Sequence, residues 1–239
     1  MADRYIGVTG FTTIEDVDIM NKSLGSSLGM YGILMSHSTL KGKPIRGRYA
    51  ALCDVKELMH NMPDKSLRTI HWCDGGWRNR ENAWKGIEEA INSAGGECNA
   101  IQLNMAYPLV DFFKTLKEKY NFKTIFQIEA QMFEDPKEMA KKMQPYKNFV
   151  DYVIIDQSMG AGIPIDPAVS KAVAKEMQGL GLGVVFAGGL CKDNVVEIAD
   201  MIKEFEASVD EEGRLMNPAG SLDHGKVKDY VREARKIIK

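Results

Sequence analysis

The sequence predicts an α/β fold in which eight short strands alternate with eight helices to form a (β/α)8 barrel. Short apolar runs rich in Val, Ile and Phe alternate along the 239 residues with longer amphipathic segments, as in parallel βαβ units. The chain is 44% hydrophobic and 27% charged, which is enough apolar material for one large core. Units of this number and length match the size of a (β/α)8 barrel, and a doubly wound open sheet is the main alternative. We expect a single domain over residues 1–239.

Each element follows from its pattern of apolar residues. The expected strands cover residues 5–9, 31–36, 68–74, 99–104, 123–130, 151–156, 183–187 and 207–210. The expected helices cover residues 14–23, 51–61, 80–93, 109–120, 136–146, 167–177, 192–205 and 223–238. Capping residues support several helix starts: Thr13 with Asp16 fits a capping box, and Asp135 and Asp166 each precede a proline at a first helical position.

Composition excludes several classes of function. The formal net charge is −2 with acidic and basic residues interspersed, so we do not expect nucleic-acid binding. No apolar run approaches the roughly 20 residues that span a bilayer, and no basic, signal-like segment opens the chain, so we expect a cytoplasmic protein without membrane contact. The scattered cysteines lack Cys-x-x-Cys spacing, which indicates reduced thiols and no structural zinc. We expect no metal and no cofactor, and we expect His60 and His224 to be solvated. The four cysteines are Cys53, Cys73, Cys98 and Cys191.

Two glycine-rich loops follow predicted strands. The strand ending at Asp156 is followed by glycines at 160 and 162, and the strand 183–187 ends at paired glycines that lead into the expected helix 192–205, near Cys191. Bare backbone N–H groups at the start of a helix attract anions, most plausibly phosphate. Paired glycines are also ordinary turn residues, so this alternative stays open. The candidate phosphate-binding residues are Gly160, Gly162, Gly188, Gly189 and Leu190.

Several stretches resemble one family in the same order along the chain. Residues 8–12 (Val-Thr-Gly-Phe-Thr), followed by Glu-Asp-Val at 15–17, resemble the first strand and loop of phosphoribosylanthranilate isomerases. Residues 101–104 (Ile-Gln-Leu-Asn) resemble the family's Val-Gln-Leu-His, and residues 187–190 (Ala-Gly-Gly-Leu) with Asn-Val at 194–195 resemble its Ala-Gly-Gly-Leu…Asn-Val. The resemblance implies a single (β/α)8 TIM barrel of the phosphate-binding type, an isomerase related to tryptophan biosynthesis, and a phosphorylated small-molecule substrate.

The resemblance also implies roles for residues at the strand ends. In the family's Amadori rearrangement, an intramolecular redox isomerisation, a carboxylic acid protonates the sugar ring oxygen and a thiolate removes the C2′ proton. Asp156 stands at the position of the acid, but Thr9 stands where the cysteine base belongs. A threonine hydroxyl is not a general base unaided near neutral pH. Glu129, Asp74 and Cys73 are therefore the candidate replacement bases.

Substrate recognition is expected from neighbouring strand ends. Gln102 and Asn104 end the fourth strand, and Arg46 and Arg48 lie in a basic loop after the second, where the family recognises a carboxylate. The family's Ser-Gly-Val-Glu phosphate loop after the eighth strand is replaced by Asp-Glu-Glu-Gly at 210–213. Carboxylates there would repel a phosphate unless they face away.

Two other functions remain open on the sequence alone. A sugar-phosphate lyase or aldolase would need a Schiff-base lysine inside a strand, but Lys123 lies at the wrong end of its strand. A metal-dependent version lacks a metal-binding spacing. A non-catalytic barrel that binds a small molecule would explain Thr9 and the altered phosphate loop. The oligomeric state is open as well, a homodimer included.

Overall fold

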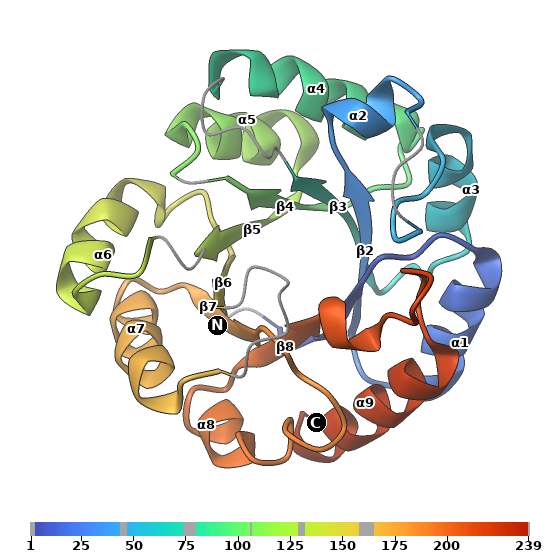
Figure 1. Cartoon of the computed structure of the whole chain (residues 1–239). Coiled ribbons are helices and arrows are strands. Elements are labelled where there is room, and N and C mark those ends of the chain that lie inside the picture. Colours follow the sequence, from blue (N-terminus) through green and yellow to red (C-terminus); the bar gives the residue numbers. More distant parts are fainter. Residues whose placement is uncertain are drawn as a thin grey trace.

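The strands form a closed barrel. The computed structural model describes residues 3–43, 47–73, 80–105, 107–128, 132–157 and 165–238. Eight parallel strands pair in sequence order, and β8 closes the ring by pairing with β1 through Ile6↔Val209 and Gly7↔Asp210. Helices surround the strands as an outer ring (Figure 1). The predicted (β/α)8 barrel is confirmed, and the open sheet is excluded.

The strands lie within two residues of their predicted bounds. They are β1 Ile6–Thr9, β2 Gly29–Met35, β3 Leu67–Cys73, β4 Ala100–Asn104, β5 Lys123–Ile128, β6 Tyr152–Asp156, β7 Gly183–Ala187 and β8 Ser208–Glu211. Alternate residues of each strand point into the barrel or toward the helices. The groups that end each strand on its inner side therefore meet at one end of the barrel.

The helices follow the prediction with one clear exception. The α-helices are α1 Ile14–Leu24, α2 His37–Leu40, α3 Val55–His60, α4 Arg80–Ser93, α5 Val110–Tyr120, α6 Pro136–Met143, α7 Pro167–Gly179, α8 Ala199–Glu204 and α9 His224–Ile237, and the 3-10 turns are η1 Leu52–Asp54, η3 Gln144–Tyr146 and η4 Gly213–Leu215. The expected helix 192–205 is wrong in its first half, because residues 192–198 form turns and α8 begins only at Ala199. The short helix α2 was not predicted.

The predicted capping residues hold the helix starts. The Thr13 side chain accepts the Asp16 N–H at 3.2 Å, and the Asp16 carboxylate accepts the Thr13 N–H at 2.9 Å, which completes the capping box of α1. Asp135 and Asp166 each accept two backbone N–H groups at the starts of α6 and α7, both of which begin with proline. Such caps satisfy donors that have no partner inside the helix.

Apolar residues fill the N-terminal part of the barrel interior. Tyr5 packs edge-on against Tyr152, with 5.1 Å between the ring centroids. This inner cluster comprises Tyr5, Met30, Leu67, Ala100, Ile125, Tyr152, Ile154, Val185 and Ala187. A larger apolar layer lies between the strands and the helices. The described interior is thus packed with apolar side chains toward the N-terminal ends of the strands and polar toward their C-terminal ends. The C-terminal ends are therefore the place for a site.

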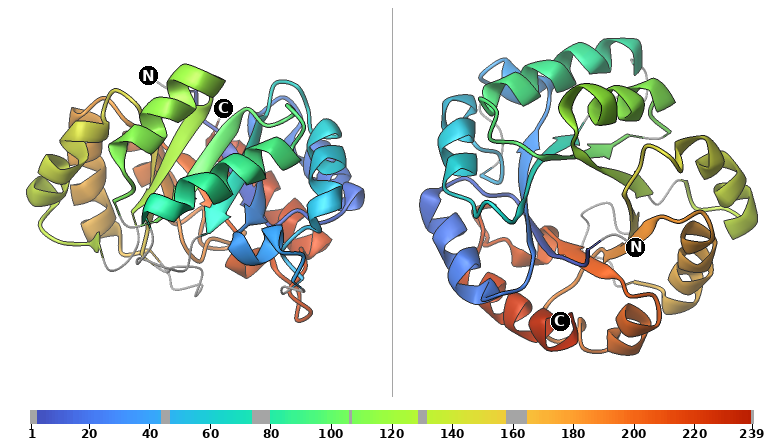
Figure 2. Two further views of the ribbon diagram at one scale, coloured as in Figure 1. Left: turned by 90° about the horizontal axis from the view of Figure 1, so that it is seen from above. Right: turned by 180° about the vertical axis from the view of Figure 1, so that it is seen from behind.

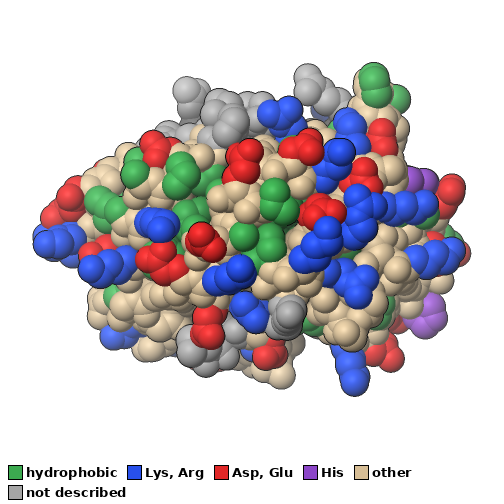
Figure 3. All heavy atoms as spheres, turned by 90° about the horizontal axis from the view of Figure 1, so that it is seen from below, with side chains coloured by type: hydrophobic (Ala, Val, Ile, Leu, Met, Phe, Trp, Pro, Cys, Tyr) green, Lys and Arg blue, Asp and Glu red, His purple; other side chains and the backbone are tan. Residues whose placement is uncertain are grey.

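The two ends of the barrel differ in what they carry. The side view in Figure 2 shows both chain termini at one end and α2 with the loop after β8 at the other. The face drawn in Figure 3 carries acidic and basic side chains together, as the interspersed charges of the sequence predict. Among the described residues, no helix is both long and apolar enough to cross a membrane.

Candidate active site

Polar and charged side chains line a cavity of about 80 Å³ at the C-terminal ends of the strands. Its described lining includes the side chains of Arg48, His71, Cys73, Gln102, Asn104, Gln127, Asp156, Asp210, Glu211 and Glu212. A larger hollow of about 1410 Å³ lies at the opposite end, among the loops that lead into the strands. We assign the site to the smaller cavity, because the strand-end functional groups of a parallel barrel converge there. We call it the mouth.

A chain of hydrogen bonds crosses four strands at the floor of the mouth. Gln127 Nε2 on β5 donates to Asp156 Oδ2 on β6 at 3.1 Å. Gln102 Nε2 on β4 donates to Gln127 Oε1 at 2.9 Å and lies 3.3 Å from His71 Nε2 on β3. Because Gln102 Nε2 has only hydrogens to offer, His71 Nε2 is the acceptor and the imidazole proton sits on Nδ1. The chain therefore fixes the Asp156 carboxylate in place.

His71 is neutral in this arrangement. Burial lowers its pKa from 6.5 to about 3, and the positive charge of Arg48 adds to this effect. Its Nδ1 atom, like Gln102 Oε1, is buried without a hydrogen-bond partner. Both residues line the mouth. Unsatisfied buried polar atoms of this kind are rare, and here they give the floor one donor and one acceptor that a bound polar group can use.

Four carboxylates meet on the other side of the mouth. Asp156 ends β6, and Asp210, Glu211 and Glu212 lie on β8 and directly after it. Burial raises the pKa of Asp210 well above its ordinary value, and the negative charges of Glu211, Glu212 and Asp156 raise it further. Burial likewise raises the pKa of Glu211 and of Glu212 to about 7. Arg48 forms an ion pair with Glu212 and partly offsets the effect of burial there.

Glu211 takes one of the backbone donors that were expected to bind phosphate, together with a second donor that was not predicted. Its Oε2 atom accepts the Leu190 N–H at 2.5 Å, and its Oε1 atom accepts the Arg214 N–H at 2.8 Å. The Cys191 N–H donates to Asn194 Oδ1 at 2.7 Å, and Asn194 Nδ2 donates to the carbonyl of Gly189 at 2.7 Å. These side-chain bonds explain why no helix starts at Cys191, since they hold residues 190–194 in a turn. The prediction that these N–H groups are free at the start of a helix is therefore wrong.

The paired glycines are required by the backbone. Gly188 has φ 102° and Gly189 has φ 64°, values that side chains of L-residues rarely adopt. This conformation turns the chain sharply at the end of β7 and directs the Leu190 N–H toward β8. Phosphate binding by Gly188, Gly189 and Leu190 stays a prediction.

Thr9 does not reach the mouth as a base would. It is fully buried, and its Oγ1 atom has no hydrogen-bond partner. The side chain points across to β2, where a Cβ atom on Gly32 would collide with it. Thr9 is absent from the residues that line the cavity. The catalytic role of Thr9 stays a prediction.

The remaining predicted residues divide into two groups. Cys73 and Asn104 both line the mouth, with Asn104 Nδ2 4.0 Å from Cys73 Sγ, and Arg48 and Gln102 lie there too. Predictions for five residues lie outside the part of the chain that the structure describes, namely Arg46, Asp74, Glu129, Gly160 and Gly162. Sequence reasoning missed Gln127 as a site residue, although a polar residue in the middle of the apolar strand Lys-Thr-Ile-Phe-Gln-Ile was a usable signal.

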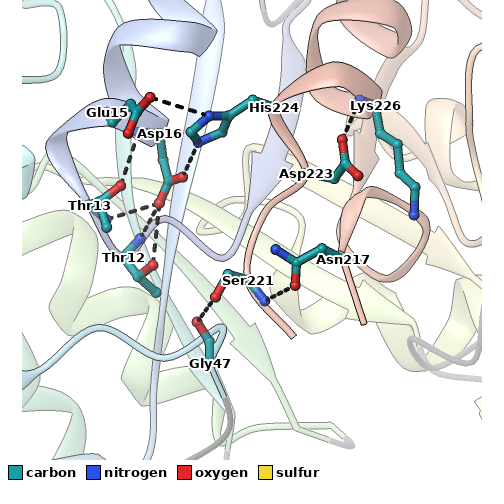
Figure 4. A network of polar contacts seen from close by, with 10 residues as sticks. All are labelled: Thr12, Thr13, Glu15, Asp16, Gly47, Asn217, Ser221, Asp223, His224 and Lys226. Atoms are coloured by element: carbon teal, nitrogen blue, oxygen red, sulfur yellow. Dashed lines mark hydrogen bonds and ion pairs between the residues drawn. The ribbon is translucent and has the colours of Figure 1, made fainter. Parts of the chain in front are cut away.

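A polar network fixes the loop after β8 against the loops after β1 and β2 (Figure 4). The Asp16 carboxylate accepts His224 Nε2 at 2.9 Å in addition to its capping bonds. Ser221 Oγ donates to the Gly47 carbonyl at 3.4 Å, and its N–H is held by Asn217. The expectation that His224 is solvated is wrong, because its side chain is 32% exposed and bonded to a buried carboxylate. These contacts hold residues 217–224, which follow β8, against the start of α1 and against Gly47.

The described residues offer no metal site. Among them, no group of three or more His, Cys, Asp and Glu side chains is arranged to hold a metal ion. Within the mouth, Glu211 instead accepts backbone N–H groups, Asp156 accepts from Gln127, and Glu212 pairs with Arg48.

Comparison with known proteins finds phosphoribosylanthranilate isomerases among the proteins that the chain resembles. No family model matches the chain. It is 25% identical over 206 residues, 83% of this chain and 84% of the relative, to N-(5'-phosphoribosyl)anthranilate isomerase of Methanococcus aeolicus. Among solved structures, phosphoribosyl anthranilate isomerase of Thermotoga maritima superposes with TM-score 0.70 at 16% identity, over 98% of this chain and 100% of that one. An isomerase in complex with reduced 1-(o-carboxyphenylamino)-1-deoxyribulose 5-phosphate gives TM-score 0.68 at 17% identity, with the same coverage of each chain. The chain therefore has a barrel like that of the phosphoribosylanthranilate isomerases.

Proposed function

We propose that the protein is a phosphoribosylanthranilate isomerase-like enzyme that binds a phosphorylated ribosyl adduct in the mouth and isomerises it by acid–base catalysis. The observation that carries the proposal is Asp156, which ends β6 in the mouth and is held there by Gln127. The relative from Methanococcus aeolicus supports the same reaction class over most of the chain. The complex of a related structure with a ribulose 5-phosphate derivative supports a phosphorylated ligand.

The proposed chemistry requires an acid and a base. Asp156 donates a proton to the ring oxygen of the ribosyl group, the C1′–O4′ bond breaks, and the amine nitrogen supplies the electron pair that forms an iminium ion. A base then removes the C2′ proton, and the resulting enol tautomerises to the ketose. Gln127 Nε2 donates to Oδ2 of Asp156 and so orients the carboxyl group toward the mouth, where a general acid is needed.

Glu212 fits the role of general base better than Thr9 does. It lines the mouth, its pKa of about 7 suits proton transfer near neutral pH, and it interacts electrostatically with Asp156. Cys73 also lines the mouth and stays a candidate, as do Asp74 and Glu129 from the sequence. We propose Gln102, Asn104 and Arg48 as substrate-binding residues on the same grounds.

The alternatives receive less support. No lysine occupies the interior of a described strand, since Lys123 begins β5 and is exposed, so an aldolase mechanism through a Schiff base lacks its nucleophile there. A non-catalytic binding barrel would have no use for an acid fixed by a buried glutamine. A single domain, a cytoplasmic location, the absence of nucleic-acid and membrane partners, and a homodimer stay predictions.

Turnover of phosphoribosylanthranilate by the purified protein, followed by fluorescence, tests the proposal. Replacing Asp156 with Asn should reduce kcat by at least about 100-fold, because a positioned general acid contributes that much, while the reduced product analogue still binds in calorimetry. Turnover that survives Asp156→Asn would refute the role of the acid. If the unmodified protein neither turns over phosphoribosylanthranilate nor binds the analogue, the proposed substrate is refuted.

A further inference from the structure

Two backbone N–H groups from adjacent loops converge on one carboxylate in the mouth. The Leu190 N–H follows β7 and the Arg214 N–H follows β8, and both donate to Glu211, at 2.5 and 2.8 Å. Each oxygen of the carboxylate takes one donor. Backbone N–H groups that point outward from the ends of neighbouring strands are what an oxyanion needs, and here the oxyanion belongs to the chain itself.

We propose that Glu211 is a built-in occupant of the anion site at the ends of β7 and β8, so that a phosphate group binds there only when the Glu211 carboxylate leaves these two amides. Each N–H carries one hydrogen, so carboxylate and phosphate compete for the same donors. The inference rests on the proposed function only for the identity of the natural anion. The competition itself is a property of the described residues.

The two N–H groups of Leu190 and Arg214 form an anion-binding cradle. The backbone around them favours an occupied cradle over an empty one. Glu211 is the last residue of β8 and is buried, and the network in Figure 4 fixes the loop that follows it. The positive φ angles of Gly188 and Gly189 fix the loop that supplies the Leu190 N–H. Two rigid loops thus present two donors whether or not a ligand is bound, and an unfilled buried donor is costly.

The charges around Glu211 work against its ionised form. Its pKa is raised from 4.5 to about 7, chiefly by burial and also by the negative charge of Asp156 on β6, against the lowering effect of the backbone N–H groups of Arg214, Leu190 and Glu212. A neutral carboxyl group competes less well for N–H donors than a carboxylate, so anion binding should strengthen as the pH falls. The titratable and charged groups that face or adjoin it are Asp156 on β6, Asp210 and Glu212 on and after β8, Tyr230 on α9, and Arg48, which pairs with Glu212.

Calorimetric titration of the full-length protein with sulfate tests the proposal, because sulfate stays a dianion throughout the range used. Between pH 5.5 and 8.5 the affinity of the unmodified protein should fall by about 30-fold, the change in the protonated fraction of a group with a pKa near 7. Glu211→Ser should bind sulfate at least about tenfold more tightly than the unmodified protein at pH 8.5 and lose most of the pH dependence. Glu211→Gln, a neutral side chain that still fills the cradle, should fall between them.

Glu212→Gln is the matched control. It removes the same charge from the same cluster but leaves both amides bound to Glu211. We expect it to raise sulfate affinity at pH 8.5 less than Glu211→Ser does, because it removes a charge but leaves the two amides occupied, and to leave the pH dependence in place. An increase equal to that of Glu211→Ser would overturn the proposal, because charge rather than occupancy would then control binding. Equal sulfate affinities of Glu211→Ser and the unmodified protein would overturn it too.

A measurement without any variant gives an independent check. Sulfate binding at pH 8 should take up a proton, seen as a heat that depends on the ionisation enthalpy of the buffer, and the absence of uptake would count against the proposal. Turnover separates this inference from the proposed function. If Glu211→Ser gains sulfate affinity but no form of the protein isomerises phosphoribosylanthranilate, the proposed function fails and the inference stands. If the protein is active and Glu211→Ser leaves KM unchanged, the inference fails and the proposed function stands.

Discussion

The carboxylates of the mouth make stability depend on pH in a direction that follows from their burial. The pKa of Glu211 and of Glu212 is raised from 4.5 to about 7 in the folded protein. Between these values the folded state holds protons that the unfolded chain has released. The free energy of unfolding therefore falls as the pH rises through this window and is highest on its acid side.

The magnitude follows from the same values, with one opposing group. A rise of about 2.5 in pKa corresponds to about 3 kcal/mol for each carboxylate, an upper value because the two share one cluster. His71 acts in the other direction, because burial lowers its pKa from 6.5 to about 3, so its contribution to stability grows with pH up to 6.5. From pH 4.5 to 6.5 that gain is about 2 kcal/mol. The two carboxylates outweigh it, leaving a net loss of about 3 kcal/mol between pH 4.5 and 7, which the raised pKa of Asp210 enlarges.

Urea unfolding at several pH values between 5 and 8, followed by tryptophan fluorescence, measures this dependence. Glu212→Gln resembles the protonated carboxyl group, so it should match the unmodified protein at pH 5 and exceed its stability at pH 8 by up to about 3 kcal/mol. Comparing the two proteins cancels the contribution of His71. Glu138→Gln, at a half-exposed position on α6, is the control and should run parallel to the unmodified protein. Parallel curves for Glu212→Gln as well would refute the reasoning.

Further substitutions test the packing of the strands and the loop network. Gly32→Ala should cost about 1–3 kcal/mol because the new methyl group meets the Thr9 side chain, and Thr9→Ala in the same chain should recover part of the loss in urea unfolding. No recovery would place the strain elsewhere. His224→Ala should cost about 1–3 kcal/mol because it leaves the buried Asp16 carboxylate without one partner, whereas His60→Ala, at a 73% exposed side chain, should change stability by less than about 0.5 kcal/mol. Equal effects of the two histidine substitutions would contradict the assigned role of the network.

Most of the fold could be predicted from the sequence because the strands are short apolar runs bounded by polar turns. Its one error among the helices is instructive. Residues 192–205 have a buried apolar face that includes Val195 and Ile202, as an amphipathic helix would. The first half nevertheless forms turns, because the Asn194 side chain takes the Cys191 N–H and bonds the Gly189 carbonyl. Apolar periodicity identifies the buried face but not how the backbone hydrogen bonds close.

The site was predictable where a residue type alone implies its role, and not where the role depends on a distant partner. The position of Asp156 in the mouth could be predicted because it ends an apolar strand. The occupation of the Leu190 N–H by Glu211 could not, because it joins two loops 21 residues apart and replaces an expected ligand by a side chain. The sequence raised only the question of whether the carboxylates after β8 face the phosphate. The structure gives a third arrangement, in which one of them, Glu211, accepts the Leu190 N–H that was predicted to bind phosphate.

The cost of the carboxylate cluster bears on whether the mouth is used. Each carboxylate whose pKa is raised by burial destabilises the folded protein at neutral pH, and a neutral amide of the same shape at Glu212 would relieve up to about 3 kcal/mol. Single substitutions that stabilise a protein in this way are common. Proteins usually keep the less stable residue only where function needs a strained or charged group. A barrel that served only as a scaffold would gain by losing these charges. Carboxylates with a pKa near 7 beside a fixed Asp156 instead suit a mouth that transfers protons. They also suit a mouth that binds an anion by displacing the Glu211 carboxylate.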